Sequence, residues 1–127
     1  MKRKLLQEAL QRALEILPRH PEYENYKHYS FLIQDNKIVG FGLNRKGSPY
    51  PSYQNHCKIH SETDCYKQVK GILKKNKVFS IINLRLGKSG QLKNSRPCPC
   101  CFNFLRSVGC REVWFSTEIG FSRLQLN

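Results

Sequence analysis

Two short clusters of ligand-type residues constrain this chain more than any other feature of its sequence. The first cluster is His60-Ser61-Glu62, and the second is Pro97-Cys98-Pro99-Cys100-Cys101. Apolar residues at helical spacing predict one helix over about residues 60–75 and another over about residues 98–108. Each cluster therefore falls at the start of a helix. A fold that joins the two clusters must bring the two helix N-termini together at one edge of its sheet.

The rest of the chain predicts one more helix, over residues 2–17, and five strands. A tight turn at Asp35-Asn36 joins the first two strands, since both residues tolerate the positive φ of such turns. Residues 87–97 are predicted to be a basic loop. The helix over 60–75 is expected to expose Lys67, Lys70 and Lys74 and to bury Cys65, Val69, Ile72 and Leu73. The predicted strands are residues 29–33, 38–43, 78–86, 112–116 and 121–126.

The order of these elements favours an α/β fold, a three-layer α/β/α sandwich. Helices that alternate with strands must pack back on the sheet, so a mixed five-stranded sheet with helices on both faces is expected. Only residues 117–120 separate the fourth strand from the fifth, and a turn that short permits only antiparallel pairing. A length of 127 residues is that of one domain, so residues 1–127 are predicted to form a single domain.

The pairing of H-x-E with P-C-x-x-C resembles the signature of the zinc-dependent nucleobase deaminases, the cytidine deaminase superfamily. The resemblance extends over residues 29–116 and implies a five-stranded mixed sheet between helices, with the base in a pocket over the zinc. Two features point to different subclasses. The antiparallel last strand is similar to that of free-nucleoside cytidine deaminases and some bacterial toxin deaminases, whereas free-nucleoside enzymes commonly have Cys where this chain has His60.

A catalytic zinc site uses three nitrogen and sulfur ligands and leaves the fourth position to water. His60, Cys98 and Cys101 are the predicted ligands, with Zn²⁺ as the cofactor. Both cysteines point at one centre from a helix start, where the helix dipole favours their thiolates. Glu62 is the predicted proton carrier, which takes a proton from the water and passes protons to the ring nitrogen and the departing ammonia. Together these residues predict a hydrolytic deaminase.

A closed zinc site without chemistry is the alternative interpretation of the same residues. It would add Cys57 as a fourth ligand and leave no position for water. This interpretation gives Glu62 no role.

The chain has six cysteines, three of which are packed into residues 98–101, and this clustering favours metal binding over a disulfide scaffold. Cys100 could replace a neighbouring ligand, although C-x-C closes a tighter turn than C-x-x-C. Cys65 and Cys110 are expected to be buried apolar fillers.

Three residues at or before the predicted start of the helix over residues 60–75 are candidates for contacts with the substrate. Residues 40–45 resemble the stretch before the H-x-E helix in bacterial tRNA adenosine deaminases and deoxycytidylate deaminases, which implies that Asn44 contacts the sugar or base; a turn residue is the alternative. Ser61 resembles the small residue whose backbone meets the base in relatives. Tyr53, in the long connection 44–59, could stack on a base or pack on its own domain.

The chain carries 22 Lys and Arg against 9 Asp and Glu, a formal net charge of +13. This excess favours a polyanionic partner, although it also serves solubility, and a free nucleoside gives no reason for it. Cytosine in single-stranded DNA or RNA is therefore the predicted substrate, because a duplex base would first have to be flipped out. Arg96 is the fourth candidate for substrate binding, and the basic residues that flank the predicted pocket in sequence are Arg45, Lys46, Lys58, Lys88, Lys93 and Arg96.

Two alternatives for the function stay open. The substrate could be free cytidine, deoxycytidine or a cytidylate, or it could be adenine, because the same metal chemistry serves both bases. In a different class, the chain could be a zinc-stabilised nucleic-acid-binding module without catalysis. No apolar stretch approaches the roughly 20 residues that span a bilayer, and no secretion signal is present, so an intracellular, cytoplasmic protein without a membrane partner is expected.

Overall fold

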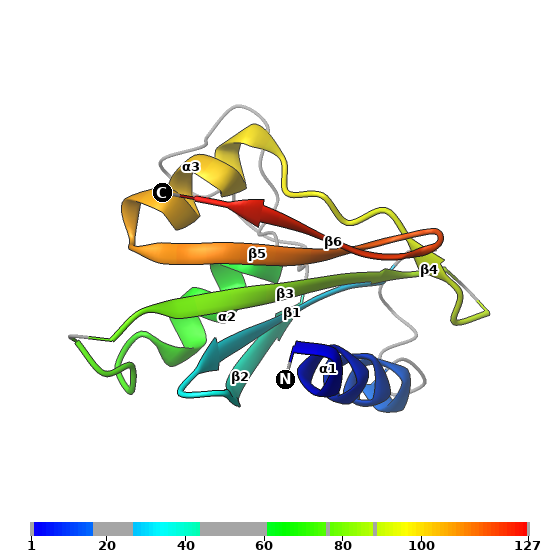
Figure 1. Ribbon diagram of the computed structural model, residues 1–127, viewed down its shortest axis with the longest axis horizontal. Helices are drawn as coiled ribbons and strands as arrows, with labels where there is room; N and C mark the ends of the chain where they lie inside the picture. Colours follow the sequence, from blue (N-terminus) through cyan, green and yellow to red (C-terminus); the bar gives the residue numbers. More distant parts are fainter. Residues whose placement is uncertain (1, 17–26, 44–60, 76, 88, 127) are drawn as a thin grey trace.

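The computed structural model describes residues 2–16, 27–43, 61–75, 77–87 and 89–126, and this part of the chain forms three helices and six strands around one sheet (Figure 1). The helices are α1 (Lys2–Ile16), α2 (Ser61–Val69) and α3 (Pro99–Ser107). The strands are β1 (Lys27–Gln34), β2 (Lys37–Leu43), β3 (Phe79–Leu86), β4 (Leu92–Lys93), β5 (Cys110–Thr117) and β6 (Gly120–Gln125).

The sheet is mixed, and its strand order is β2-β1-β3-β5-β6, with β4 paired to β3 at the side of this path. β3 and β5 run parallel, while the other paired strands run antiparallel. The turn between β5 and β6 closes at Thr117 and Gly120, and the two strands are antiparallel, as the short connection predicted. The mixed sheet and the direction of its last strand are thus confirmed.

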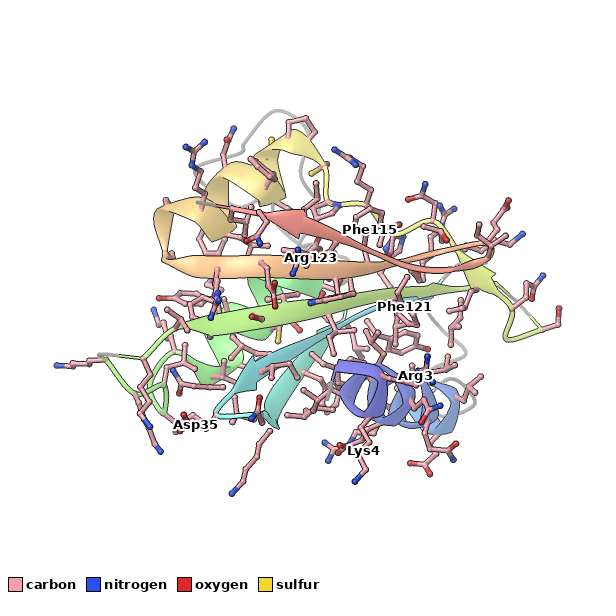
Figure 2. The ribbon with its side chains drawn as sticks, in the orientation of Figure 1. Arg3, Lys4, Asp35, Phe115, Phe121 and Arg123 are labelled. Carbon is pink, nitrogen blue, oxygen red and sulfur yellow. The ribbon has the colours of Figure 1, made fainter. Side chains whose placement is uncertain are left out.

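Helices cover both faces of the sheet, which confirms the three-layer sandwich (Figure 1). On one face α1 buries Leu5, Ala9 and Ala13 against strand residues that include Phe31 and Ile82. Its opposite side is polar, and Arg3 and Lys4 lie exposed there (Figure 2). Within the described residues, no helix has the length and apolar character needed to cross a membrane.

The other face of the sheet carries α2 and α3. Val69 of α2 and Leu105 of α3 pack against Leu32, Ile81 and Val113 in a second apolar cluster. Successive residues of a strand point to opposite faces, so Phe31 and Leu32 of β1 serve different clusters. Both helices that carry the predicted site therefore share one face of the sheet.

The predicted hairpin is confirmed. Asp35 and Asn36 have φ values of 55° and 60°, and two consecutive left-handed residues form the turn that matches the twist of an antiparallel pair. The strands on either side, β1 and β2, pair from Gln34 and Lys37 to Tyr29 and Leu43.

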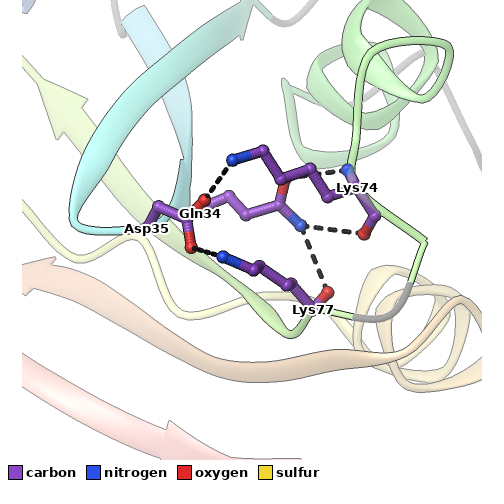
Figure 3. Close-up of polar contacts among 4 residues, drawn as sticks. All are labelled: Gln34, Asp35, Lys74 and Lys77. Atoms are coloured by element: carbon purple, nitrogen blue, oxygen red, sulfur yellow. Dashed lines mark hydrogen bonds and ion pairs between the residues drawn. The ribbon is translucent and has the colours of Figure 1, made fainter.

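The second helix is shorter than predicted, and a buried side chain of the hairpin binds the residues that follow it. Gln34 donates from Nε2 to the carbonyl oxygens of Lys74 (3.2 Å) and Lys77 (3.1 Å), and its Oε1 accepts from the Lys74 N–H at 2.9 Å (Figure 3). Asp35 adds ion pairs to both lysines at 2.8 and 3.1 Å. α2 ends at Val69, two residues before Gly71, which disfavours a continued helix. Ile72, which was predicted to be buried, is 69% exposed.

The segment predicted to be a basic loop contains an additional strand. β4 pairs with the end of β3, with Lys93 opposite Arg85 and Leu92 opposite Leu86, so the sheet has six strands in place of the five predicted. A strand of two residues is too short to produce an alternating pattern in the sequence. Its pairing holds the approach to α3 against the carboxyl end of β3.

Candidate active site

The starts of α2 and α3 lie at the same edge of the sheet, as predicted. α2 leads into β3 and α3 leads into β5, and these two strands are parallel neighbours, so both helices begin near the strands' carboxyl ends. Asn83 of β3 contacts both the first turn of α2 and the segment before α3. Its Nδ2 donates to Glu62 Oε2 at 2.9 Å and to the carbonyl oxygen of Ser95 at 3.3 Å.

The predicted proton carrier, Glu62, lies in the first turn of α2 and is only 6% exposed. A carboxylate at this depth needs hydrogen-bond donors, and a helix N-terminus also favours its negative charge. Its Oε2 accepts from Asn83, and its Oε1 lies 3.2 Å from the hydroxyl of Ser61. Glu62 is therefore held inside the protein with its oxygens directed at named partners.

Four side chains close a buried polar ring at this point. The hydroxyl groups of Ser30 and Ser61 lie 2.7 Å apart, and Ser30 also donates to Asn83 Oδ1. With the contacts to Glu62, the ring runs through Ser30, Ser61, Glu62 and Asn83, all of them buried. The hydroxyl of Ser61 thus faces the interior.

Sequence reasoning missed Ser30 and Asn83. Each is a polar residue between apolar neighbours, Ser30 between Tyr29 and Phe31 in β1 and Asn83 between Ile82 and Leu84 in β3. A polar side chain in a strand buried on both faces requires a partner. That requirement was the signal that could have found both residues.

The cysteine half of the site is built on the first turn of α3. Cys98 is the N-cap in an extended conformation (φ −69°, ψ 163°), and Pro99 occupies the first helical position, where its missing N–H costs nothing. The Cys98 carbonyl accepts from the Phe102 N–H at 2.9 Å. Cys101 lies in the same turn and is 2% exposed, so both thiols belong to one helix N-terminus, which favours thiolates.

Two serines fix the segment that leads to Cys98. The Ser95 N–H donates to the Ser116 carbonyl at 2.9 Å, and Ser95 Oγ accepts from the Ser116 N–H at 2.8 Å while it donates to the Asn83 carbonyl at 3.0 Å. Ser116 Oγ in turn donates to the Lys93 carbonyl at 2.6 Å. Both serines are buried, so this segment is tied to β3 and β5 at once.

Glycines on β2 allow α2 to approach the sheet closely. A Cβ at Gly42 would overlap the backbone nitrogen of Cys65 and would lie 2.6 Å from the carbonyl oxygen of Ser61. A Cβ at Gly40 would overlap the side chain of Val69. The backbone of β2 therefore sets how deep the first turn of α2, with Glu62, lies.

Several predicted site residues lie outside the described residues, namely His60, Asn44, Tyr53 and Cys57. In the part of the chain that the structure describes, no three His, Cys, Asp or Glu side chains gather as a metal site. The residues present nevertheless fit zinc, because two thiols share one helix N-terminus and a buried carboxylate lies at the same sheet edge. His60 directly precedes Ser61, the first residue of α2.

Cys65 and Cys110 are buried fillers, as predicted, with 0% and 3% exposure. Burial raises the pKa of the Cys110 thiol to about 12 and raises the pKa of the Cys65 thiol further. Neither residue supplies a thiolate ligand at neutral pH.

Arg96, predicted to bind substrate, is exposed between Ser95 and Pro97. The Arg96 guanidinium lies over the ring of Phe115, 5.8 Å from the centroid. The backbone N–H of Arg96 donates to Asn94 Oδ1 at 2.8 Å. A cation thus lies two residues before Cys98, which places a positive charge beside the candidate site.

No protein-family model matches the chain, and no curated protein matches its sequence. Solved structures do match. The apo dCMP deaminase from the cyanophage S-TIM5 aligns with a TM-score of 0.60 at 13% identity, over 91% of this chain and 84% of that chain. The cytidine deaminase from Mycobacterium leprae aligns with a TM-score of 0.56 at 16% identity, over 97% and 93%. The fold is that of the cytidine deaminases.

The cytidine deaminase of Mycobacterium tuberculosis also matches, with a TM-score of 0.51 at 15% identity, over 82% of this chain and 75% of that chain. The cytidine deaminase fold was expected from the resemblance of H-x-E and P-C-x-x-C, and it is confirmed. Glu62 lies in the first turn of α2 and Cys98 is the N-cap of α3, and both helices cover the same face of the sheet. At these identities the likeness establishes the fold, and the chemistry is argued from the residues themselves.

Proposed function

We propose that this protein is a zinc-dependent hydrolytic deaminase that converts cytosine to uracil. The observation that supports the proposal most strongly is the buried carboxylate of Glu62 at the sheet edge where α3 presents Cys98 and Cys101. A structural zinc site needs no such carboxylate, whereas a hydrolytic site needs a group that moves protons.

His60, Cys98 and Cys101 would hold the Zn²⁺ ion, whose chemistry at such a site is to make water acidic, with a pKa of roughly 7. Glu62 would then accept a proton from the attacking water and deliver it to the ring nitrogen of cytosine. A second proton transfer through Glu62 lets the exocyclic amine leave as ammonia, so that cytosine and water give uracil and ammonia. The burial of Glu62 would shield the transferred proton from bulk water.

For the substrate we favour cytosine in a single nucleic acid strand. The net charge of +13 supports this choice, because a strand presents phosphates to surface cations and a nucleoside presents none. Arg96, which is exposed two residues before Cys98, would bind a phosphate near the target base.

A free cytidylate is the second candidate. The S-TIM5 dCMP deaminase, solved in complex with dCMP and dUMP, aligns with this chain at a TM-score of 0.60 and 13% identity, over 91% of this chain and 82% of that chain. A mononucleotide also carries phosphate, which Arg96 could bind. The two candidates differ in how many phosphates the protein contacts.

Product analysis separates these candidates. The zinc-loaded protein is incubated with cytidine, dCMP, and DNA and RNA oligonucleotides that contain one cytosine, and uracil is quantified. We expect uracil in the oligonucleotides, at a rate that falls steeply with salt, because salt suppresses counterion release from a polyanion. A salt-independent rate on dCMP would favour the mononucleotide.

Glu62→Gln is the matched control for catalysis. It should abolish uracil formation and leave the zinc content unchanged, since Glu62 is not a ligand in the proposed site. Zinc-loaded wild-type protein that binds oligonucleotides but forms no uracil from any of these substrates would contradict the proposed cytosine deaminase.

A further inference from the structure

We infer that Asn83 is a positioning residue that orients Glu62 and couples it to the segment leading to Cys98. The inference rests on the proposed function in that Glu62 is taken as the proton carrier. Its physical basis is the polar ring formed by Ser30, Ser61, Glu62 and Asn83.

A count of the hydroxyl and amide protons in this ring shows that Asn83 donates to Glu62 with a proton that it does not have to share. The Oδ1 of Asn83 only accepts, so Ser30 must use its single hydroxyl proton there. The contact between the two hydroxyls then requires the proton of Ser61. Ser61 therefore has to share one proton between Ser30 at 2.7 Å and Glu62 at 3.2 Å, whereas Asn83 offers Glu62 an N–H of its own at 2.9 Å.

The surroundings fix which way the Asn83 amide points. Two acceptors, Glu62 Oε2 and the Ser95 carbonyl, lie on the Nδ2 side, and the hydroxyl of Ser30 lies on the Oδ1 side. A flipped amide would set its oxygen against both acceptors. Both protons and the oxygen of the amide are thus committed, and the side chain is 3% exposed.

One amide therefore spans the two halves of the site. Its first proton holds the carboxylate at the start of α2, and its second holds the backbone of Ser95, three residues before Cys98. Asn83 itself stands on β3, between β1 and β5 in the sheet. A group on such a rigid strand can keep a reacting carboxylate within the narrow geometry that proton transfer needs.

The substitution Asn83→Asp tests this role with almost no change in shape. It replaces the donor with a carboxylate oxygen 2.9 Å from Glu62 Oε2 and opposite the Ser95 carbonyl. We expect kcat to fall by about 10- to 100-fold, with KM within about 2-fold of the wild-type value and zinc content unchanged. Asn103→Asp, at an exposed position of α3, adds the same charge and should leave kcat unchanged. A wild-type kcat in Asn83→Asp would overturn the inference.

A second measurement does not depend on activity. In the double variant Glu62→Gln with Asn83→Asp, donor and acceptor exchange places, because the new amide can donate to the new carboxylate. The loss in the thermal midpoint should be clearly smaller than the sum of the losses in the two single variants. Additive losses would show that the two side chains are not coupled and would overturn the inference.

The remaining outcomes are also decisive. If Asn83→Asp does not fold and the double variant does, the rescue supports the coupling. If neither folds, Ser30→Ala, which loosens the amide without adding charge, should lower kcat by about 3- to 10-fold at constant KM, and an unchanged kcat would overturn the inference. Coupling in stability without deamination by the wild-type protein would instead refute the proposed function alone.

Discussion

Ser30 and Asn83 face each other directly across the β1–β3 pair, and their side chains are hydrogen-bonded. Both lie on the sheet face that α2 covers, where their neighbours Leu32 and Ile81 are apolar. A shift of one residue in this pairing would separate the two polar groups and leave them buried without partners. This pair thus helps to set the strand register as well as to support Glu62.

Zinc binding should depend on two of the three clustered cysteines. We expect Cys98→Ser and Cys101→Ser to lose the metal, because their C-x-x-C spacing at the start of α3 suits one metal centre, and Cys100→Ser to retain it. Zinc per chain, measured by mass spectrometry of the purified variants, checks this. Cys57→Ser should also retain zinc, and loss of the metal in that variant would indicate the closed four-ligand site.

Ser95→Ala should lower the free energy of unfolding by about 1–3 kcal/mol. The substitution removes the acceptor of the Ser116 N–H and the donor to the Asn83 carbonyl in a buried position. Urea unfolding measures the change, and Ser122→Ala, at an exposed position of β6, is the matched control. Equal stability of the two variants would mean that the Ser95–Ser116 contact does not hold the approach to α3.

Gly42→Ala should destabilise the protein by about 1–3 kcal/mol and lower deamination with it. The added methyl group would overlap the backbone of α2 at Cys65, so the first turn that carries Glu62 has to move. Gly71→Ala is the control, since a Cβ there meets nothing within 4 Å. Thermal unfolding and single-turnover rates of both variants test the prediction, and a Gly42→Ala protein of wild-type rate contradicts it.

Stability should decline as the pH rises above about 9. The unfolded Cys110 thiol ionises near its ordinary pKa of 9.0, whereas burial raises the folded pKa to about 12. Between these values the unfolded chain holds fewer protons, so the free energy of unfolding falls by about 1.4 kcal/mol per pH unit for this thiol. Denaturant unfolding from pH 8 to 11 measures the slope. Cys110→Ala should reduce it, and an unchanged slope would show that this thiol does not titrate on unfolding.

Gln34→Ala should release Lys74 and Lys77 from the hairpin. Its amide makes three hydrogen bonds to the backbone of Lys74 and Lys77. We expect faster amide hydrogen exchange at Lys74 and a loss of about 1–3 kcal/mol. Gln7→Ala, on the exposed side of α1, should change neither quantity. Unchanged exchange at Lys74 would show that Gln34 does not hold the backbone after α2.

Much of the fold could be predicted because its signals are local. The periodicity and the two clusters placed α2 and α3 at one sheet edge, and the four-residue connection set the direction of β6. The contacts that hold the chain after α2 could not be predicted, because they come from Gln34, which lies far away in the sequence. Ser30 and Asn83 were missed for a related reason, since their partners are identified only once β1 and β3 are paired.

The position of α1 has a practical consequence for experiments. This helix covers the sheet face opposite to α2 and α3, so the sheet itself separates it from the edge where Glu62 and Cys98 lie. A dye or surface tether attached to the outer side of α1, for example at position 7, would stand behind the sheet. Immobilised protein could then be tested for the proposed deamination of oligonucleotides, with the edge that carries Glu62 and Cys98 facing the solution.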